Sequence, residues 1–219
     1  GAALYFRVGV AFEKAWMDRL RAAAPGMKVI DLRQGLKLRS IGAYEHHPDA
    51  GGEPDAGVSR DTSHGAEERV PSENVDPHIW TSPANAVTMV GHIRDALGRM
   101  DPAGREHYRR NAARYIQDLR ALDRRLAERL APYEGQAFVV FHPAWGYFAD
   151  RYGLVQRAIE AGGRQPGPSA LDQRIHEVRE LGAQLVFVQD QFSQRAAKAI
   201  AKAGDAGVVS IDPLAPDYI

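Results

Sequence analysis

The 219-residue sequence contains no cysteine. Disulfide frameworks and thiolate metal sites are therefore excluded, and any metal ion has to be held by nitrogen and oxygen atoms. Lysine plus arginine and aspartate plus glutamate both number 28, so the formal net charge is zero. This balance gives no electrostatic reason to expect nucleic acid or an anionic membrane as a partner. No apolar run approaches the roughly 18 residues needed to span a bilayer, and no signal peptide opens the sequence.

Several common catalytic motifs are also missing. The patterns GxSxG, HExxH, Walker A and GxGxxG do not occur, so a motif-based hydrolase, metalloprotease or nucleotide-binding function has no support. The composition is that of a globular protein, with 44% hydrophobic and 26% charged residues. A chain of this length can form one large domain or two small lobes with real cores.

Short apolar runs alternate with helical patterns, which predicts an α/β fold with parallel sheets flanked by helices. Strands are expected at about residues 2–10, 28–32, 137–141, 154–159, 184–189 and 208–212. Helices are expected at about 12–24, 83–99, 103–130, 169–181 and 193–203, and a further short helix is expected to end at Tyr152. The helix at 103–130 would be on the order of 40 Å long, enough to join two lobes. We expect Trp16 to lie in the core, on one apolar face with Phe12.

Regular patterning fails from about residue 34 to residue 74. This stretch is rich in glycine, proline and acidic residues and carries His46, His47 and His64. A surface loop with incidental histidines is one interpretation. The other is a flexible histidine-bearing lid that collects a soft or borderline metal ion.

The sequence VDPHIWTSP, residues 75–83, presents a histidine on a stiff lead-in to a helix. Pro77 fixes its own φ and biases the preceding residue away from helix, while Ser82 and Pro83 are expected as N-cap and first helical residue. His78 is therefore held in place. The plainer interpretation, a histidine that only hydrogen-bonds within a turn, stays open for this residue alone.

Two further candidate ligands follow predicted strands. His142 comes directly after the strand at 137–141 and Asp212 ends the strand at 208–212, and each is followed by proline. Ligands of open α/β sheets bind beyond the carboxyl ends of the strands. Together with His78, two imidazoles and a carboxylate are a plausible site for a borderline metal such as zinc. A zinc enzyme would also need a general base, for which only Glu160 and Asp190 are candidates.

Three separated segments resemble a known family. VDPHIWTSPANAVTMVGHIRDAL (75–97) is similar to the DPHxWLSP signature of the cluster A-I (cluster 9) solute-binding proteins of metal-uptake ABC transporters. FVVFHPAWGYFADRYGL (138–154) is similar to the second signature, and residues 186–215 resemble the C-terminal portion. LYFRVGVAFEKAW (4–16) resembles the strand-to-helix entry. The chain is thus identified as a member of the zinc-uptake (ZnuA/TroA-like) family.

The resemblance implies two α/β lobes joined by a long rigid helix, with only small lobe movements. We expect an N-terminal lobe at 1–100 that includes the loop at about 34–74, a linking helix at 101–132, and a C-terminal lobe at 133–219. By the same resemblance, His78, His142 and Asp212 match the second, third and fourth metal ligands. Manganese-binding relatives usually have glutamate at the third position, so His142 favours Zn²⁺ over Mn²⁺. His46, His47 and His64 stand where zinc-specific members have a histidine-rich loop.

The resemblance also implies that the chain is a fragment. The family's first strand–helix portion, with its first ligand histidine, would precede Gly1, and its last helix would follow Ile219. An export signal and any lipid-anchoring cysteine would lie in the preceding portion. We expect water or a loop histidine to complete the metal shell, and zinc to bind more weakly than in an intact relative.

The function implied is capture of Zn²⁺ in the cleft between the lobes and its delivery to an ABC permease, without catalysis. The expected location is the periplasm or the extracellular face of the cytoplasmic membrane. The alternatives are a Mn²⁺-binding member of the same family and a zinc-dependent hydrolase. The sequence gives no argument for or against cell adhesion, a role often attached to this family.

Overall fold

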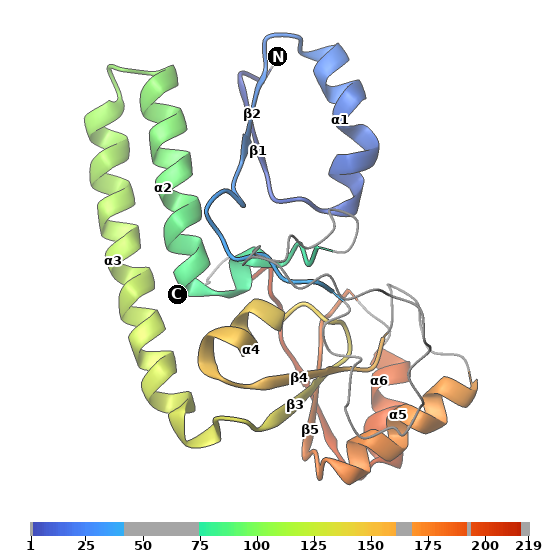
Figure 1. Cartoon of the computed structure of the whole chain (residues 1–219). Coiled ribbons are helices and arrows are strands. Elements are labelled where there is room, and N and C mark those ends of the chain that lie inside the picture. The colour runs from blue at the N-terminus through green and yellow to red at the C-terminus, as the bar shows by residue number, and fades with distance from the viewer. Residues whose placement is uncertain (1, 42–74, 161–167, 192–193, 216–219) are drawn as a thin grey trace, which may run out of the picture.

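The structure is a computed structural model that describes residues 2–41, 75–160, 168–191 and 194–215. The described residues form two parallel sheets, one near the N-terminus and one in the C-terminal half, with helices packed around them (Figure 1). The predicted α/β class with parallel sheets is confirmed. The loop histidines His46, His47 and His64 lie outside the described residues. No helix in the described part of the chain is long and apolar enough to cross a membrane.

The first sheet has two strands, β1 (Leu4–Arg7) and β2 (Lys28–Asp31), which pair in parallel with Leu4 opposite Lys28. Helix α1 (Ala11–Ala23) connects them. The apolar side chains of β2 and of the segment that follows it pack around Leu32, Ile79 and Tyr147. This cluster therefore already joins the first sheet to segments far along the chain.

Helix α1 turns a different face inward from the one that hydrophobicity predicts. Phe12 is 57% exposed and Trp16 is 58% exposed, whereas Glu13 and Met17 are buried. The prediction that Trp16 lies in the core was wrong. The reason lies in Glu13, whose carboxylate accepts hydrogen bonds from the backbone N–H groups of Val8 and Gly9 and thereby fixes the rotation of the helix.

Helices α2 (Pro83–Met100) and α3 (Arg105–Leu130) lie side by side as an antiparallel hairpin (Figure 1). A short 3-10 turn, η1 (Ile79–Thr81), leads into α2. Ser82 is the N-cap residue and Pro83 is the first helical residue, as predicted, although no side-chain hydrogen bond caps the helix. Helix α3 extends past α2 and carries the chain to the second sheet, which agrees with the predicted strut.

The connection between α2 and α3 explains why α3 begins later than predicted. Asp101 accepts a hydrogen bond from the backbone N–H of Gly104 through Oδ1 and another from the Tyr108 hydroxyl through Oδ2. Asp101 thus caps a turn that precedes the helix, and regular helix starts at Arg105.

The second sheet has four parallel strands in the order β4-β3-β5-β6. They are β3 (Ala137–Val140), β4 (Val155–Ala158), β5 (Leu185–Val188) and β6 (Gly207–Ser210). The connecting elements are the 3-10 turn η2 (Ala131–Tyr133) and the helices α4 (Gly146–Tyr152), α5 (Pro168–Glu180) and α6 (Gln194–Ala203). Apolar side chains of β3 and β5 pack against Val178 of α5 and Ile200 of α6 to form the largest core.

The ends of these elements determine where the candidate site residues lie. Gly153 closes α4 in the left-handed conformation, with a φ of 68°, as the sequence indicates. Helix α5 begins at Pro168, one residue before the predicted cap at Ser169. The carboxyl ends of β3, β5 and β6 meet at one edge of the second sheet, because the strands are parallel. Domain boundaries at residues 100 and 132 remain our prediction.

Candidate metal site

His78 is positioned by the residue two places before it. Asp76, which is 1% exposed, accepts hydrogen bonds through Oδ1 from the His78 backbone N–H at 3.0 Å and from its ring Nδ1 at 2.7 Å. Pro77 between them fixes φ and makes this short loop stiff. The His78 carbonyl accepts a hydrogen bond from the hydroxyl of Thr81, the last residue of η1. The ring is thus held at its Nδ1 side and presents Nε2 outward.

His142 is positioned in the same way by a different carboxylate. It follows β3, and its Nδ1 lies 3.3 Å from Oε2 of Glu160, which follows β4 and is 5% exposed. Because β3 and β4 are neighbours in register, their carboxyl ends bring these two residues together. Burial lowers the pKa of His142 below its ordinary value, and the nearby Glu160 carboxylate opposes that effect. A neutral ring is the form that binds a metal ion.

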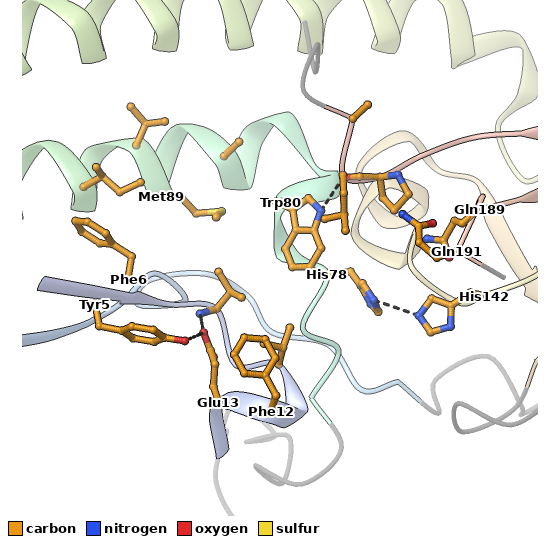
Figure 2. A pocket seen from close by; sticks show the side chains of 18 of the residues that line it. Tyr5, Phe6, Phe12, Glu13, His78, Trp80, Met89, His142, Gln189 and Gln191 are labelled. Atoms are coloured by element: carbon orange, nitrogen blue, oxygen red, sulfur yellow. Dashed lines mark hydrogen bonds between the residues drawn. The ribbon is translucent and has the colours of Figure 1, made fainter. Parts of the chain in front are cut away.

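The Nε2 atoms of the two rings approach each other across the boundary between the lobes, with an angle of 79° between the ring planes (Figure 2). The Nε2 atoms of His78 and His142 lie 3.3 Å apart and the ring centroids 5.2 Å apart. Two nitrogen ligands of a tetrahedral zinc ion, at about 2.0–2.1 Å from the metal, stand about 3.3 Å apart. If each carboxylate accepts the Nδ1 proton, both Nε2 atoms are left with a lone pair, which is the form that binds a metal ion. That arrangement suits a cation.

A cavity of about 890 Å³ opens in front of the histidine pair (Figure 2). Its walls come from β1, α1 and α2 of the first lobe and from the ends of β3, β5 and β6 of the second. Trp80 lines it and donates a hydrogen bond from Nε1 to the carbonyl of Pro213 at 3.0 Å, which ties the two lobes together at the cavity wall. Gln189 and Gln191 contribute polar groups beside His142.

Asp212, the third predicted ligand, occupies the predicted strand end but has other partners. Its Oδ1 accepts hydrogen bonds from the Leu214 backbone N–H at 2.9 Å and from Gln191 Nε2 at 3.3 Å. Strand β5 separates β3 from β6, so the ends of these strands lie roughly 10 Å apart. Among the described residues, no three His, Cys, Asp or Glu side chains form a group that could hold a metal ion. The structure brings two of the three predicted ligands together.

The sequence did not reveal the partners of the two histidines. The sequence offers Glu160 as a candidate general base, but its carboxylate lies on the Nδ1 side of the His142 ring. Asp190, the other candidate base, is exposed and accepts a hydrogen bond from the Ser210 hydroxyl. The short spacing between Asp76 and His78 is the one signal that could have indicated an orienting carboxylate.

The fold has two α/β lobes with a pair of histidines between them. A family model described as "Zinc-uptake complex component A periplasmic" matches residues 1–219, and the chain belongs to this family. The predicted resemblance is therefore confirmed. The family is one of transport components and not one of enzymes.

Individual relatives agree with this assignment. The zinc-binding lipoprotein AdcA of Streptococcus pneumoniae serotype 4 is 35% identical over 203 residues, which are 92% of this chain and 38% of that protein. The zinc uptake protein ZnuA of Brucella abortus is 33% identical over 141 residues, which are 64% of this chain and 42% of that protein. The chain thus spans well under half the length of these relatives.

Solved structures show the same fold. A crystal structure of ZnuA matches with a TM-score of 0.80 and 33% identity, covering 99% of this chain and 74% of that chain. The laminin-binding protein Lbp of Streptococcus pyogenes matches with a TM-score of 0.74 and 25% identity, covering 99% and 74%. The predicted fold of two lobes with a long linking helix is that of this family.

Proposed function

We propose that this chain captures Zn²⁺ between its two lobes and delivers it to an ABC permease. The observation that carries the proposal is the pair of Nε2 atoms 3.3 Å apart, each on a ring whose Nδ1 is held by a buried carboxylate. Zinc-binding histidines are typically oriented in this way. Relatives named for zinc binding and zinc uptake support the same metal. The family description supports a periplasmic location or one on the outer face of the cytoplasmic membrane.

Asp212 is our proposed third ligand. Its carboxylate accepts hydrogen bonds from Gln191 and from a backbone N–H at the cavity wall, so it would exchange these partners for the metal ion. The fourth position is left to water or to one of His46, His47 and His64, because zinc in proteins is most often four-coordinate. Release then requires only that the ligands lose their common geometry.

Zinc is favoured over manganese by the ligand chemistry. Imidazole nitrogen suits zinc, whereas carboxylate and carbonyl oxygens suit manganese. The core of the proposed site has two imidazoles, and its two nearest carboxylates hydrogen-bond to the rings rather than facing the space between them. A hydrolase is disfavoured because Glu160 faces the back of His142 and Asp190 is bonded to Ser210. Neither is free to act as general base toward a metal-bound water.

The test is a competitive titration of Zn²⁺ and Mn²⁺ by calorimetry. We expect the wild-type chain to prefer zinc, and His142→Ala to weaken zinc binding by at least about 100-fold, which exceeds the usual effect of an orienting residue. His176→Ala is the matched control, because His176 is an exposed histidine on α5 that does not line the cavity. It should bind zinc as tightly as wild type.

Two results would overturn the proposal. Zinc binding that survives His142→Ala would move the metal to other ligands, of which the loop histidines are the first candidates. A preference for Mn²⁺ in the wild-type chain would reject the assigned metal and leave the site in place.

A further inference from the structure

The backbone around Arg39 pairs with the residues that directly precede His78. Arg39 lies in the segment after β2, where Ser40 forms an antiparallel bridge with Val75. The Arg39 carbonyl accepts a hydrogen bond from the Asp76 backbone N–H at 2.9 Å. Two stretches 37 residues apart in sequence are therefore locked together directly before the metal-site histidine.

The Arg39 side chain reaches the carboxylate that orients His78. Its Nη1 lies 3.4 Å from Asp76 Oδ2, while the other oxygen of the same carboxylate bonds His78. The Arg39 side chain is 9% exposed and that of Asp76 is 1% exposed. A buried carboxylate without a cationic partner is strongly disfavoured. The carboxylate thus bridges a guanidinium on one side and an imidazole on the other.

The same arginine also contacts helix α4 of the second lobe. Its Nε lies 3.0 Å from Asp150 Oδ2, and its backbone N–H donates to the Tyr147 hydroxyl at 3.3 Å. That hydroxyl in turn donates to the Asp76 carbonyl at 2.8 Å. Burial raises the pKa of Tyr147 to about 12, so the hydroxyl keeps its proton. The guanidinium therefore contacts two separate segments, the one that carries His78 and helix α4.

Gly146, the first residue of α4, has no side chain, and the Arg39 guanidinium occupies the space that a side chain would fill. A Cβ at this position would lie 1.3 Å from Arg39 Nη1 and 2.8 Å from Asp76 Oδ2. No side chain fits there while Arg39 holds its position. This close fit between Gly146 and the guanidinium is a second, independent observation that the structure holds Arg39 in one position.

We propose that Arg39 is a positioning residue of the metal site. Seated against Gly146, it fixes the Asp76 carboxylate, and Asp76 fixes the His78 ring with Nε2 directed at His142. This inference rests on the proposed function, because it assigns Arg39 a part in zinc affinity. Loss of an outer partner of a metal ligand typically lowers metal affinity 10- to 100-fold.

The first test compares zinc affinity in substituted full chains by competition titration. Arg39→Met should bind zinc 10- to 100-fold more weakly, and Arg39→Lys should lose less, because it keeps the charge but not the planar fork that spans Asp76 and Asp150. Arg151→Met is the matched control. It removes an α4 ion pair, with Asp123, that does not contact Asp76, and it should reduce stability without changing zinc affinity.

A second measurement separates positioning from stability. In metal-free protein, the ¹⁵N chemical shifts of the His78 ring report its tautomer, and we expect the Nδ1–H form in wild type and a mixture in Arg39→Met. Gly146→Ala should also weaken zinc binding, because its Cβ would meet both Arg39 Nη1 and Asp76 Oδ2. If Arg39→Met does not fold, Arg39→Lys and Gly146→Ala decide the question.

The outcomes distinguish this inference from the proposed function. Arg39 variants that bind zinc as tightly as wild type and keep the His78 tautomer would overturn the positioning role and leave zinc capture intact. Zinc binding that is insensitive to His142→Ala would overturn the proposed function, and the tautomer measurement would still decide whether Arg39 orients His78.

Discussion

Glu160 and Asp76 have the same relation to the two imidazole rings, although they come from different lobes. Each is a buried carboxylate next to an Nδ1 atom, on the side away from the facing Nε2 atoms. A carboxylate in this place fixes the tautomer and raises the basicity of the ring. The geometry therefore predicts that metal affinity at the proposed site depends on residues outside the ligand set.

Glu160→Gln tests this dependence. The substitution keeps the shape of the side chain and removes its charge, so we expect zinc affinity to fall about 10-fold or more, within the range known for such partners. Competition titration measures the change. Glu177→Gln on α5, away from the cavity, is the control. An unchanged affinity in Glu160→Gln would show that His142 does not need its carboxylate.

At the scale of elements, α3 and α4 are joined by a cluster of polar contacts. Asp123 of α3 accepts a hydrogen bond from Arg151 Nε at 2.8 Å and another from the Tyr152 hydroxyl at 3.0 Å. The hydrogen bond from Arg151 is the main cause that lowers the pKa of Asp123 below its usual value. These contacts hold α4 against the linking helix α3.

Asp123→Asn should destabilise the protein at pH 7 by about 1 kcal/mol, the upper end of what an exposed ion pair contributes. A carboxyl whose pKa is lower in the folded state stabilises the fold above its unfolded pKa of about 3.9, and the contribution is lost as the pH falls through the folded value. The difference between wild type and Asp123→Asn in urea unfolding should therefore shrink below about pH 4. A difference that stays constant from pH 7 to pH 3 would contradict this assignment.

Elements with apolar periodicity or clear end signals could be predicted from the sequence, and those fixed by polar contacts could not. The strands of the second sheet and the closure of α4 at Gly153 follow from local patterns. The face of α1 and the start of α3 do not, because Glu13 and Asp101 bind backbone groups whose positions depend on the fold. The site divides in the same way. Motifs indicated His78 and His142, whereas their contact depends on how the lobes meet.

At the scale of the molecule, the two lobes are tied together at several points. Helix α3 runs from the end of α2 to the second sheet (Figure 1). Trp80 bonds the Pro213 carbonyl, and Arg39 pairs with Asp150. Tyr147 of α4 packs in the same apolar cluster as Leu32 and Ile79 of the first lobe. A wide hinge motion would have to break all of these contacts.

Zinc binding should therefore change the overall dimensions of the molecule very little. We expect small-angle X-ray scattering of the metal-free and zinc-loaded chain to give the same radius of gyration within error, because the histidine pair already stands at the spacing that a tetrahedral zinc ion requires. A clear compaction on addition of zinc would show that the lobes close around the metal by a hinge instead.

The fit of Gly146 against Arg39 has a consequence for how such sequences diversify. A Cβ at position 146 would overlap the guanidinium, so a lineage that keeps the arginine cannot accept a larger residue there. A lineage that loses the arginine leaves Asp76 without this cation, and a side chain at position 146 would still have to clear Asp76 Oδ2, 2.8 Å from its Cβ. Arginine at position 39 therefore requires glycine 107 residues further along the chain, at position 146.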